Sequence, residues 1–277
     1  GATYHAMAAS LAFDRDLEFG PEDLERVRSS YPGGPQGVFL KRVPGEDGPR
    51  LVYAKALAYP SAAAPFVRVL GADRGLLVLN ALLFGVALWA GYSELRRSSG
   101  AAAAAAGALA VFAAGVVPVY LLWETPEVFN LGVVTLGLVA WRRERPLVSA
   151  LLLGLAAYSK PTNLALALPL LLDPLVSREA RGWTRRLGES ARRAAVVAAA
   201  VAAGFSLTWL ATGEVNYQGG ERKTFYDRYP FDPGVTFDSA GVWMTTDHLG
   251  PLVAGRDDHK QTDRVARRSV LWAFPAY

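Results

Sequence analysis

Long apolar runs between residues 75 and 212 constrain this chain more than any other feature. A helix needs roughly 20 mostly apolar residues to cross the hydrocarbon core of a bilayer, and several runs approach that length. Hydrophobic residues make up 52% of the sequence, and they concentrate here, leaving polar segments at both ends. The pattern predicts an all-α polytopic membrane protein with apolar segments at 75–94, 101–123, 128–141, 147–173 and 194–212.

Basic residues fill the gaps between these runs and suggest a topology, because loops rich in Lys and Arg stay on the cytoplasmic side. Three groups of arginines belong there by this rule: Arg96 with Arg97, Arg142 with Arg143 and Arg145, and six from Arg178 to Arg193. The groups share one side only if residues 147–173 cross and return, as a re-entrant pair of short helices broken at Lys160-Pro161. The alternative is one kinked helix that puts six arginines outside and buries Lys160 in mid-span.

Under the first topology the chain has three parts. Residues 1–72 form the first extracytoplasmic loop, and residues 73–212 form the transmembrane helices. Residues 213–277 form an extracytoplasmic loop that leads into a further, truncated helix. Because the run 269–277 is apolar and no signal segment follows Gly1, we expect further helices beyond both ends.

The first loop contains both helical and extended segments. Apolar residues at helical spacing predict an amphipathic helix at 2–13, and a first-turn proline supports a short helix at 21–29. Runs at 38–43 and 51–55 flank turn residues, which suggests a small hairpin. Residues 61–70 are expected to form a second amphipathic helix, lying in the membrane interface.

Composition and spacing exclude several function classes. The net charge of +4 is compatible with nucleic-acid binding, but the basic residues lie where membrane topology places them, so no nucleic-acid partner is expected. The absence of cysteine excludes disulfides, thiolate catalysis and Cys-based zinc sites. His5, His248 and His259 lack the paired spacing of a metal motif, so no metal site is predicted. The glycine motifs of serine hydrolases and nucleotide-binding enzymes are absent.

Carboxylates and lysines of the polar segments are candidates for chemistry. Asp14 and Asp16 would share one face of an extended segment, where they could hold a divalent cation or act as a general base; a solvated acidic turn is the alternative. Lys55 suits a phosphate at headgroup level, or an ordinary contact with lipid headgroups. Lys160 is either a functional cation within the apolar hairpin or a lysine that snorkels to the surface.

Two further groups could bind substrate. Glu124 and Glu127 frame a short outer turn, where they could bind substrate hydroxyls or a metal ion, or complement the dipole of the following helix. Residues 217–231 interleave aromatic and basic side chains, notably Arg222 and Tyr226. Such a mixture suits carbohydrate or phosphate recognition, and it suits interfacial anchoring equally well.

The order of several segments resembles that of a known family, the GT-C superfamily of membrane glycosyltransferases. The likeness is to its protein-mannosyltransferase-like and aminoarabinose-transferase-like bacterial branch, and it covers residues 1 to about 212. It is carried by the helix from Tyr4 to Leu11, Asp14 to Phe19, Lys55 to Pro60, Pro126-Glu127 and Ser159-Lys160-Pro161-Thr162. The resemblance implies a GT-C-like transmembrane helix bundle with interfacial helices in its extracytoplasmic loops.

The resemblance also implies an activity. The expected reaction is inverting transfer of a sugar from a polyprenyl-phosphate donor to an unidentified acceptor, in the bacterial inner membrane, with the active site facing the periplasm or cell exterior. The family's general base opens the first loop helix, which would place it just before Gly1; Asp16 and Asp14 are the nearest carboxylates to carry that role. Lys55 matches the family's lysine beside the donor phosphate, and Lys160 adds a second cation. With two lysines there, no cofactor is predicted, although a divalent cation is compatible with the site.

Two other functions fit the residues alone. Transporters and flippases for amphiphilic envelope substrates often contain helices broken near mid-membrane, as at Lys160-Pro161, but they rarely carry outer loops this long and polar. A non-enzymatic scaffold for envelope assembly is the other possibility. Internal symmetry between the two halves would favour a transporter, and the sequence has none that is visible.

Overall fold

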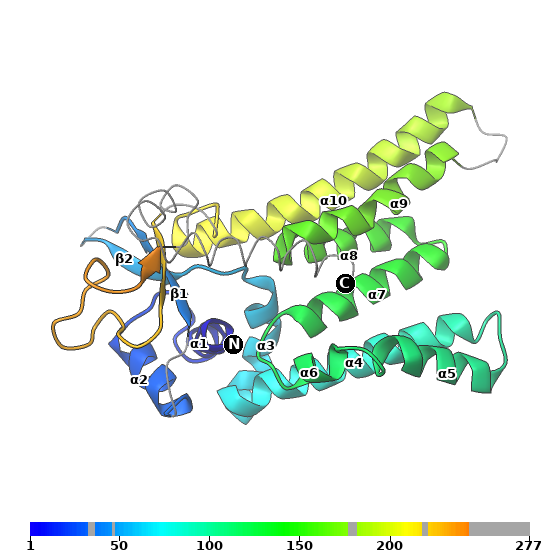
Figure 1. Cartoon of the computed structure of the whole chain (residues 1–277). Coiled ribbons are helices and arrows are strands. Elements are labelled where there is room, and N and C mark those ends of the chain that lie inside the picture. The colour runs from blue at the N-terminus through cyan, green and yellow to red at the C-terminus, as the bar shows by residue number, and fades with distance from the viewer. Residues whose placement is uncertain (33–36, 46–47, 177–181, 218–220, 244–277) are drawn as a thin grey trace, which may run out of the picture.

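The computed structural model describes residues 1–32, 37–45, 48–176, 182–217 and 221–243. Long helices extend side by side from one end of the molecule, where a small sheet and two short helices lie (Figure 1). The elements, in chain order, are α1 (Ala2–Phe13), α2 (Pro21–Ser30), β1 (Val38–Val43), β2 (Arg50–Tyr53), α3 (Ala58–Leu70), α4 (Ala72–Leu95), α5 (Ala101–Phe112), α6 (Val117–Leu121), α7 (Glu127–Arg142), α8 (Pro146–Ser159), η1 (Pro161–Asn163), α9 (Leu164–Val176), α10 (Trp183–Thr212), β3 (Arg222–Phe225) and β4 (Val242–Trp243).

The sheet corrects the all-α prediction. Its four antiparallel strands follow the order β2-β1-β3-β4, and the predicted hairpin is confirmed as β1 and β2, with Leu40 opposite Tyr53. The third strand was missed, because a segment of four residues that begins with two cations gives no alternating pattern. Lys223 is nevertheless buried, and its ammonium donates to the carbonyls of Phe237 at 2.8 Å and Ala240 at 3.1 Å. β3 therefore joins the first and last polar segments into one unit.

Helix α1 forms the centre of this unit. The helix was predicted correctly, but its amphipathic character was not, because every residue from His5 to Ser10 is buried. Consecutive burial means that neighbours enclose the helix on all sides. Its alanines allow close approach, and Met7 packs in the core with Leu40 and Phe225 of the sheet.

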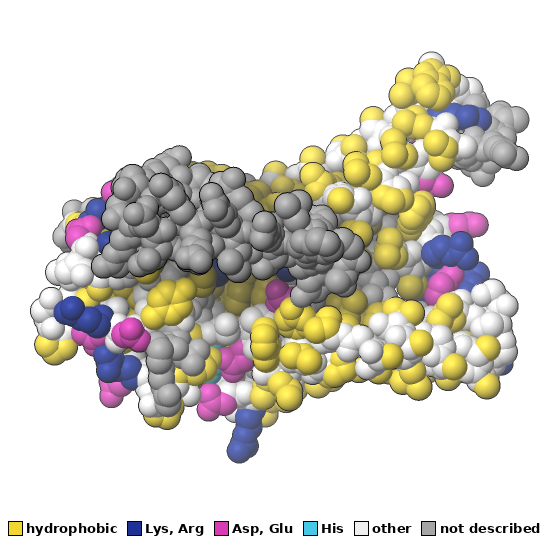
Figure 2. All heavy atoms as spheres, in the orientation of Figure 1, with side chains coloured by type: hydrophobic (Ala, Val, Ile, Leu, Met, Phe, Trp, Pro, Cys, Tyr) yellow, Lys and Arg dark blue, Asp and Glu magenta, His cyan; other side chains and the backbone are white. Residues whose placement is uncertain are grey.

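The apolar surface lies along the long helices. Two of the described helices, α4 with 24 residues and α10 with 30, are long and apolar enough to cross a membrane. Hydrophobic side chains cover much of the helical part in Figure 2, and Trp89 of α4 and Leu210 of α10 are 69% and 72% exposed. A surface of this kind suits a lipid environment better than water.

The run 101–123 is not the single span that was predicted. It divides into α5, with 12 residues, and α6, with five. Gly115 lies in the interruption and Pro118 is the second residue of α6, where a proline cannot donate the amide that a continuous helix requires. A 12-residue helix is about 18 Å long, shorter than the ~30 Å hydrocarbon core.

The run 147–173 forms two helices that reverse direction. Lys160 has extended backbone angles (φ −146°, ψ 104°), and the chain then continues through η1 into α9. Asp173 near the end of α9 meets Trp141 at the end of α7 and Arg193 near the start of α10. The helix α10 begins earlier than expected, so Arg185, Arg186, Arg192 and Arg193 lie within it and not in a loop.

The two ends of the helical layer differ in chemistry. One end carries the sheet with Lys55, Lys160 and the two glutamates, while Arg97, Arg142, Arg143 and Arg145 line a cavity at the other. The re-entrant topology itself stays a prediction. Which end faces the cytoplasm stays a prediction, and the further helix expected after residue 269 lies outside the described residues.

Candidate functional site

The candidate site lies where α7, the α8–α9 reversal, and the segment after β2 approach the sheet. Glu127 stands in the first turn of α7, and Lys160 stands at the reversal. The Lys160 ammonium lies 3.3 Å from Glu127 Oε1, with the two side chains 50% and 30% exposed. The helix dipole of α7 also favours an acid at this position. Two residues from separate predicted segments therefore form one ion pair.

Lys55 stands in the short connection from β2 to α3, near enough for the charge of Glu127 to act on it. Its ammonium stands 3.6 Å from the centroid of the Phe39 ring, and the Arg222 guanidinium lies 5.9 Å from the same centroid. Within the part of the chain that the structure describes, no carboxylate or carbonyl lies within hydrogen-bonding reach of the Lys55 ammonium. Lys55, Glu127, Lys160 and Arg222 are called the Lys55 cluster below.

Burial and the neighbouring charges perturb the cations of this cluster. Burial lowers the pKa of Lys55 to about 8; the Arg222 guanidinium also lowers it and Glu127 opposes the shift. Burial likewise lowers the pKa of Arg222, against an opposing effect from Tyr217. Two cations held together in a poorly solvated place repel each other. An anion bound between them would relieve that repulsion.

A group of aromatic side chains fixes the backbone next to Lys55. Tyr158 accepts a hydrogen bond from the Leu57 amide at 3.1 Å, and its carbonyl accepts one from the Tyr217 hydroxyl at 2.9 Å. Tyr217 stacks on Phe205 with ring centroids 5.8 Å apart. Residues of α8 and α10 and the segment before β3 thus position the connection that carries Lys55. Tyr217 belongs to the aromatic segment singled out in the sequence, whereas no motif marks Tyr158 or Phe205.

Glu124 lies near the cluster but has a different environment. His5 Nδ1 lies 3.1 Å from both of its oxygens, and the Tyr31 hydroxyl donates to Oε2. Burial tends to raise the Glu124 pKa, but the hydrogen bonds from His5 and Tyr31 outweigh burial and lower it. His5 is also bound to Ser30 through Nε2, at 3.1 Å. Glu124 therefore joins α1, α2 and the α6–α7 turn, and its contacts are structural.

Asp14 and Asp16 lie at the opposite end of α1 from this region. A Cβ atom at Gly1, before the helix, would stand 3.9 Å from the Glu124 Cβ, whereas Asp14 caps the far end of a 12-residue helix about 18 Å long. Asp14 pairs with Arg26, and the exposed Asp16 accepts a hydrogen bond from the Glu18 amide. Burial, with the nearby carboxylates, raises the pKa of Asp16 although that hydrogen bond opposes it. The structure thus groups four predicted residues and separates these two.

Tyr226 lies outside the Lys55 cluster. It is 46% exposed and lines a cavity of about 270 Å³ between α2 and the segment after β3. Tyr31, which also lines this cavity, donates to Glu124. Tyr226 therefore shares a cavity with the tyrosine that contacts Glu124.

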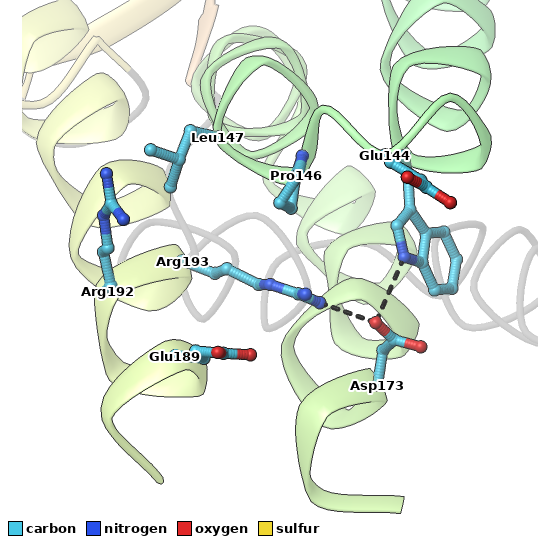
Figure 3. A pocket seen from close by; sticks show the side chains of 8 residues that line it. Glu144, Pro146, Leu147, Asp173, Glu189, Arg192 and Arg193 are labelled. Carbon is cyan, nitrogen blue, oxygen red and sulfur yellow. Dashed lines mark hydrogen bonds and ion pairs between the residues drawn. The ribbon is translucent and has the colours of Figure 1, made fainter. Parts of the chain in front are cut away.

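A larger cavity, of about 470 Å³, lies at the arginine end and contains no predicted site residue (Figure 3). Asp173 Oδ2 accepts from Arg193 at 2.8 Å and from the Trp141 indole at 3.5 Å, which ties α7, α9 and α10 together. The acidic and basic residues that line this cavity lie at the end of the molecule away from the sheet. We place the candidate site at the Lys55 cluster because it holds several cations close together, and the Lys55 ammonium has no anionic partner within hydrogen-bonding reach among the described residues.

Potential metal ligands do not form a group in the described chain. No set of three His, Cys, Asp or Glu side chains in those residues lies in a position to hold an ion. His5 binds Glu124 and Ser30, while His248 and His259 lie outside the described residues.

Comparison with known families decides the class of this protein. The family model described as glycosyltransferase family 87 matches residues 54–231, which is well over half of the chain. The chain belongs to glycosyltransferase family 87. This is a GT-C membrane glycosyltransferase family, so the predicted superfamily and the predicted enzyme class are confirmed. No curated protein and no solved structure matches the chain.

The matched segment begins one residue before Lys55 and includes the whole Lys55 cluster, together with Glu124 and Tyr226. Asp14 and Asp16 lie outside it. Membership in this family favours the enzyme over the transporter and scaffold hypotheses.

Proposed function

We propose that this family 87 glycosyltransferase uses a polyprenyl-phosphate-linked sugar as donor. The half-buried Lys55 ammonium carries the proposal, because it has no anionic partner among the described residues and stands beside a second cation, Arg222. A phosphate beside these groups would supply the anionic partner that the Lys55 ammonium lacks. A donor with a long apolar tail also suits a site at the end of exposed apolar helices.

The proposed reaction is a single displacement. An acceptor hydroxyl or amine attacks the anomeric carbon, and the bond from that carbon to the phosphate oxygen breaks. The acceptor proton passes to a carboxylate, and the departing lipid phosphate gains one negative charge. Lys55 and Arg222 stabilise that developing charge, with Lys160 as a third cation. Attack opposite to the leaving group inverts the anomeric configuration. The site faces the extracytoplasmic side in the topology proposed from the arginines.

The carboxylates divide among three roles. Glu127 lies beside the cations, so we assign it to binding of sugar hydroxyls, while Glu124 is held by His5 and Tyr31 and supports the site. Asp16 and Asp14 keep the general-base role as a prediction from the resemblance. A direct test of Asp16 accompanies the Lys55 prediction below.

The donor class can be tested with purified full-length protein. We expect transfer of radiolabelled sugar from at least one polyprenyl-phosphate sugar in a panel, and none from the corresponding nucleotide sugars, because the nucleotide donors lack the apolar tail. Products are separated by thin-layer chromatography. Transfer from nucleotide sugars alone would refute the lipid-linked donor while leaving the family assignment intact.

The Lys55 pKa gives a pH dependence. Since burial lowers this pKa to about 8, the ammonium loses its proton as the pH rises through that value, and donor binding should weaken. We expect kcat/KM for the donor to fall roughly tenfold between pH 7 and pH 9. Lys55→Arg should remove this fall, because a guanidinium stays charged throughout the range. An identical fall in Lys55→Arg would assign the titration to another group.

A further inference from the structure

Four arginines line one cavity at the end of the molecule opposite the Lys55 cluster. The cavity measures about 430 Å³ and is lined by Arg97, Arg142, Arg143, Glu144 and Arg145. Arg97 follows the end of α4, and the others form the connection from α7 to α8. Charge rules of membrane topology explain why arginines occupy these loops, but they do not require four of them to converge on one hollow.

The positive charge of this cavity is only partly neutralised. Glu94 lies 3.3 Å from Arg142 and 3.5 Å from Arg143, so these two arginines share one carboxylate. For Arg97 and Arg145, no carboxylate within the described chain lies in ion-pair distance. Glu144 is the one acid among the residues that line this cavity. The cavity therefore keeps a net positive charge.

Aromatic and apolar side chains next to the cavity indicate the level of a membrane surface. On α4, Trp89 and Tyr92 precede the arginines by one to two turns, with ring centroids 5.7 Å apart, and Trp89 is 69% exposed. Tryptophan and tyrosine concentrate where the bilayer meets water. Leu95, directly before the arginines, is also exposed. A ligand that fills the cavity would thus have apolar surface beside it.

We propose that this cavity binds the headgroup phosphate of an anionic phospholipid. Basic pockets between membrane helices are suited to such headgroups, and guanidinium groups bind phosphate oxygens in a bidentate manner. The apolar neighbours favour a lipid over a soluble phosphate, since the acyl chains can continue along α4. The proposal concerns the end away from the Lys55 cluster, so it does not depend on the donor assignment.

The test uses full-length protein in detergent, titrated with phosphatidylglycerol or phosphatidylcholine, with bound lipid counted by native mass spectrometry. We expect phosphatidylglycerol to bind at least tenfold more tightly. In Arg97→Gln/Arg145→Gln its affinity should fall about 25-fold, or fivefold for each basic residue removed. The control Arg96→Gln/Arg185→Gln removes equal charge outside the cavity, where Arg96 binds the Ser99 carbonyl and Arg185 pairs with Glu189, and should cost less than threefold.

A gain of binding separates this proposal from simple misfolding. Glu144→Gln removes the acid from the cavity wall, so phosphatidylglycerol should bind about two- to fivefold more tightly. Equal binding of the two lipids, equal losses in both double variants, or weaker binding by Glu144→Gln would each overturn the proposal. Glycerol 1-phosphate should not displace the lipid; displacement as effective as that by the lipid itself would identify a soluble phosphate as the ligand and overturn it too.

Discussion

Replacement of Lys55 by alanine should lower sugar transfer by about 10²- to 10³-fold, the usual cost of removing one group that stabilises transition-state charge. The ammonium lies beside Arg222 and has no carboxylate partner among the described residues, so its charge is available to the donor phosphate. The measurement is kcat/KM for a polyprenyl-phosphate sugar with purified protein. Lys55→Arg, which keeps the charge, should retain a substantial part of the activity.

The fold should tolerate this change. Lys55→Ala removes a half-buried charge that has no anionic partner, so the midpoint of thermal unfolding should stay the same or rise. An inactive variant that also unfolds early would point to a structural role, and full activity of Lys55→Ala would exclude this lysine from the reaction.

In the same assay, the activity of Asp16→Asn should fall by about 10²- to 10⁴-fold if Asp16 is the base. A loss of activity below threefold would mean that another carboxylate is the general base.

Elements with a strong local pattern were predictable from the sequence. The hairpin 38–43 with 51–55 and the helix 21–29 were confirmed because turn residues and a first-turn proline mark their limits. The prediction of a single span at 101–123 was wrong because it rested on apolar character alone, whereas Gly115 and Pro118 disfavour a continuous helix. β3 could not be found locally, since its strand partner β1 lies about 180 residues earlier in the chain.

The candidate site was predictable in its residue types more than in its grouping. Lys55, Glu127 and Arg222 are candidates as charged residues of polar segments, Lys160 is one as a cation within an apolar hairpin, and the structure brings the four together. Asp14 and Asp16 are also charged residues of a polar segment, but the length of α1 separates them from the others. The contact of His5 with Glu124 joins residues 119 positions apart, and no spacing rule reaches that far.

Removal of the Glu124 carboxylate should produce the largest loss of stability, about 2–4 kcal/mol for Glu124→Ala. His5 Nδ1 and the Tyr31 hydroxyl would both lose their partner, and each buried polar group left without one costs about 1–3 kcal/mol. The side chain of His5 is only 2% exposed, so water cannot readily replace the carboxylate. In a chain of this size the midpoint of thermal unfolding should fall by about 5–15 °C.

Glu127→Ala is the matched control, three residues along the same turn. Its ion pair with Lys160 is partly exposed, and such pairs contribute less than about 1 kcal/mol, so the unfolding midpoint should change by no more than about 3 °C. Sugar transfer should fall instead, because Glu127 stands in the Lys55 cluster. Thermal unfolding in detergent and the transfer assay, applied to both variants, separate the two roles. If Glu124→Ala is as stable as the unchanged protein, Glu124 does not support the fold. If Glu127→Ala is unstable but transfers sugar normally, Glu127 does not contact the substrate.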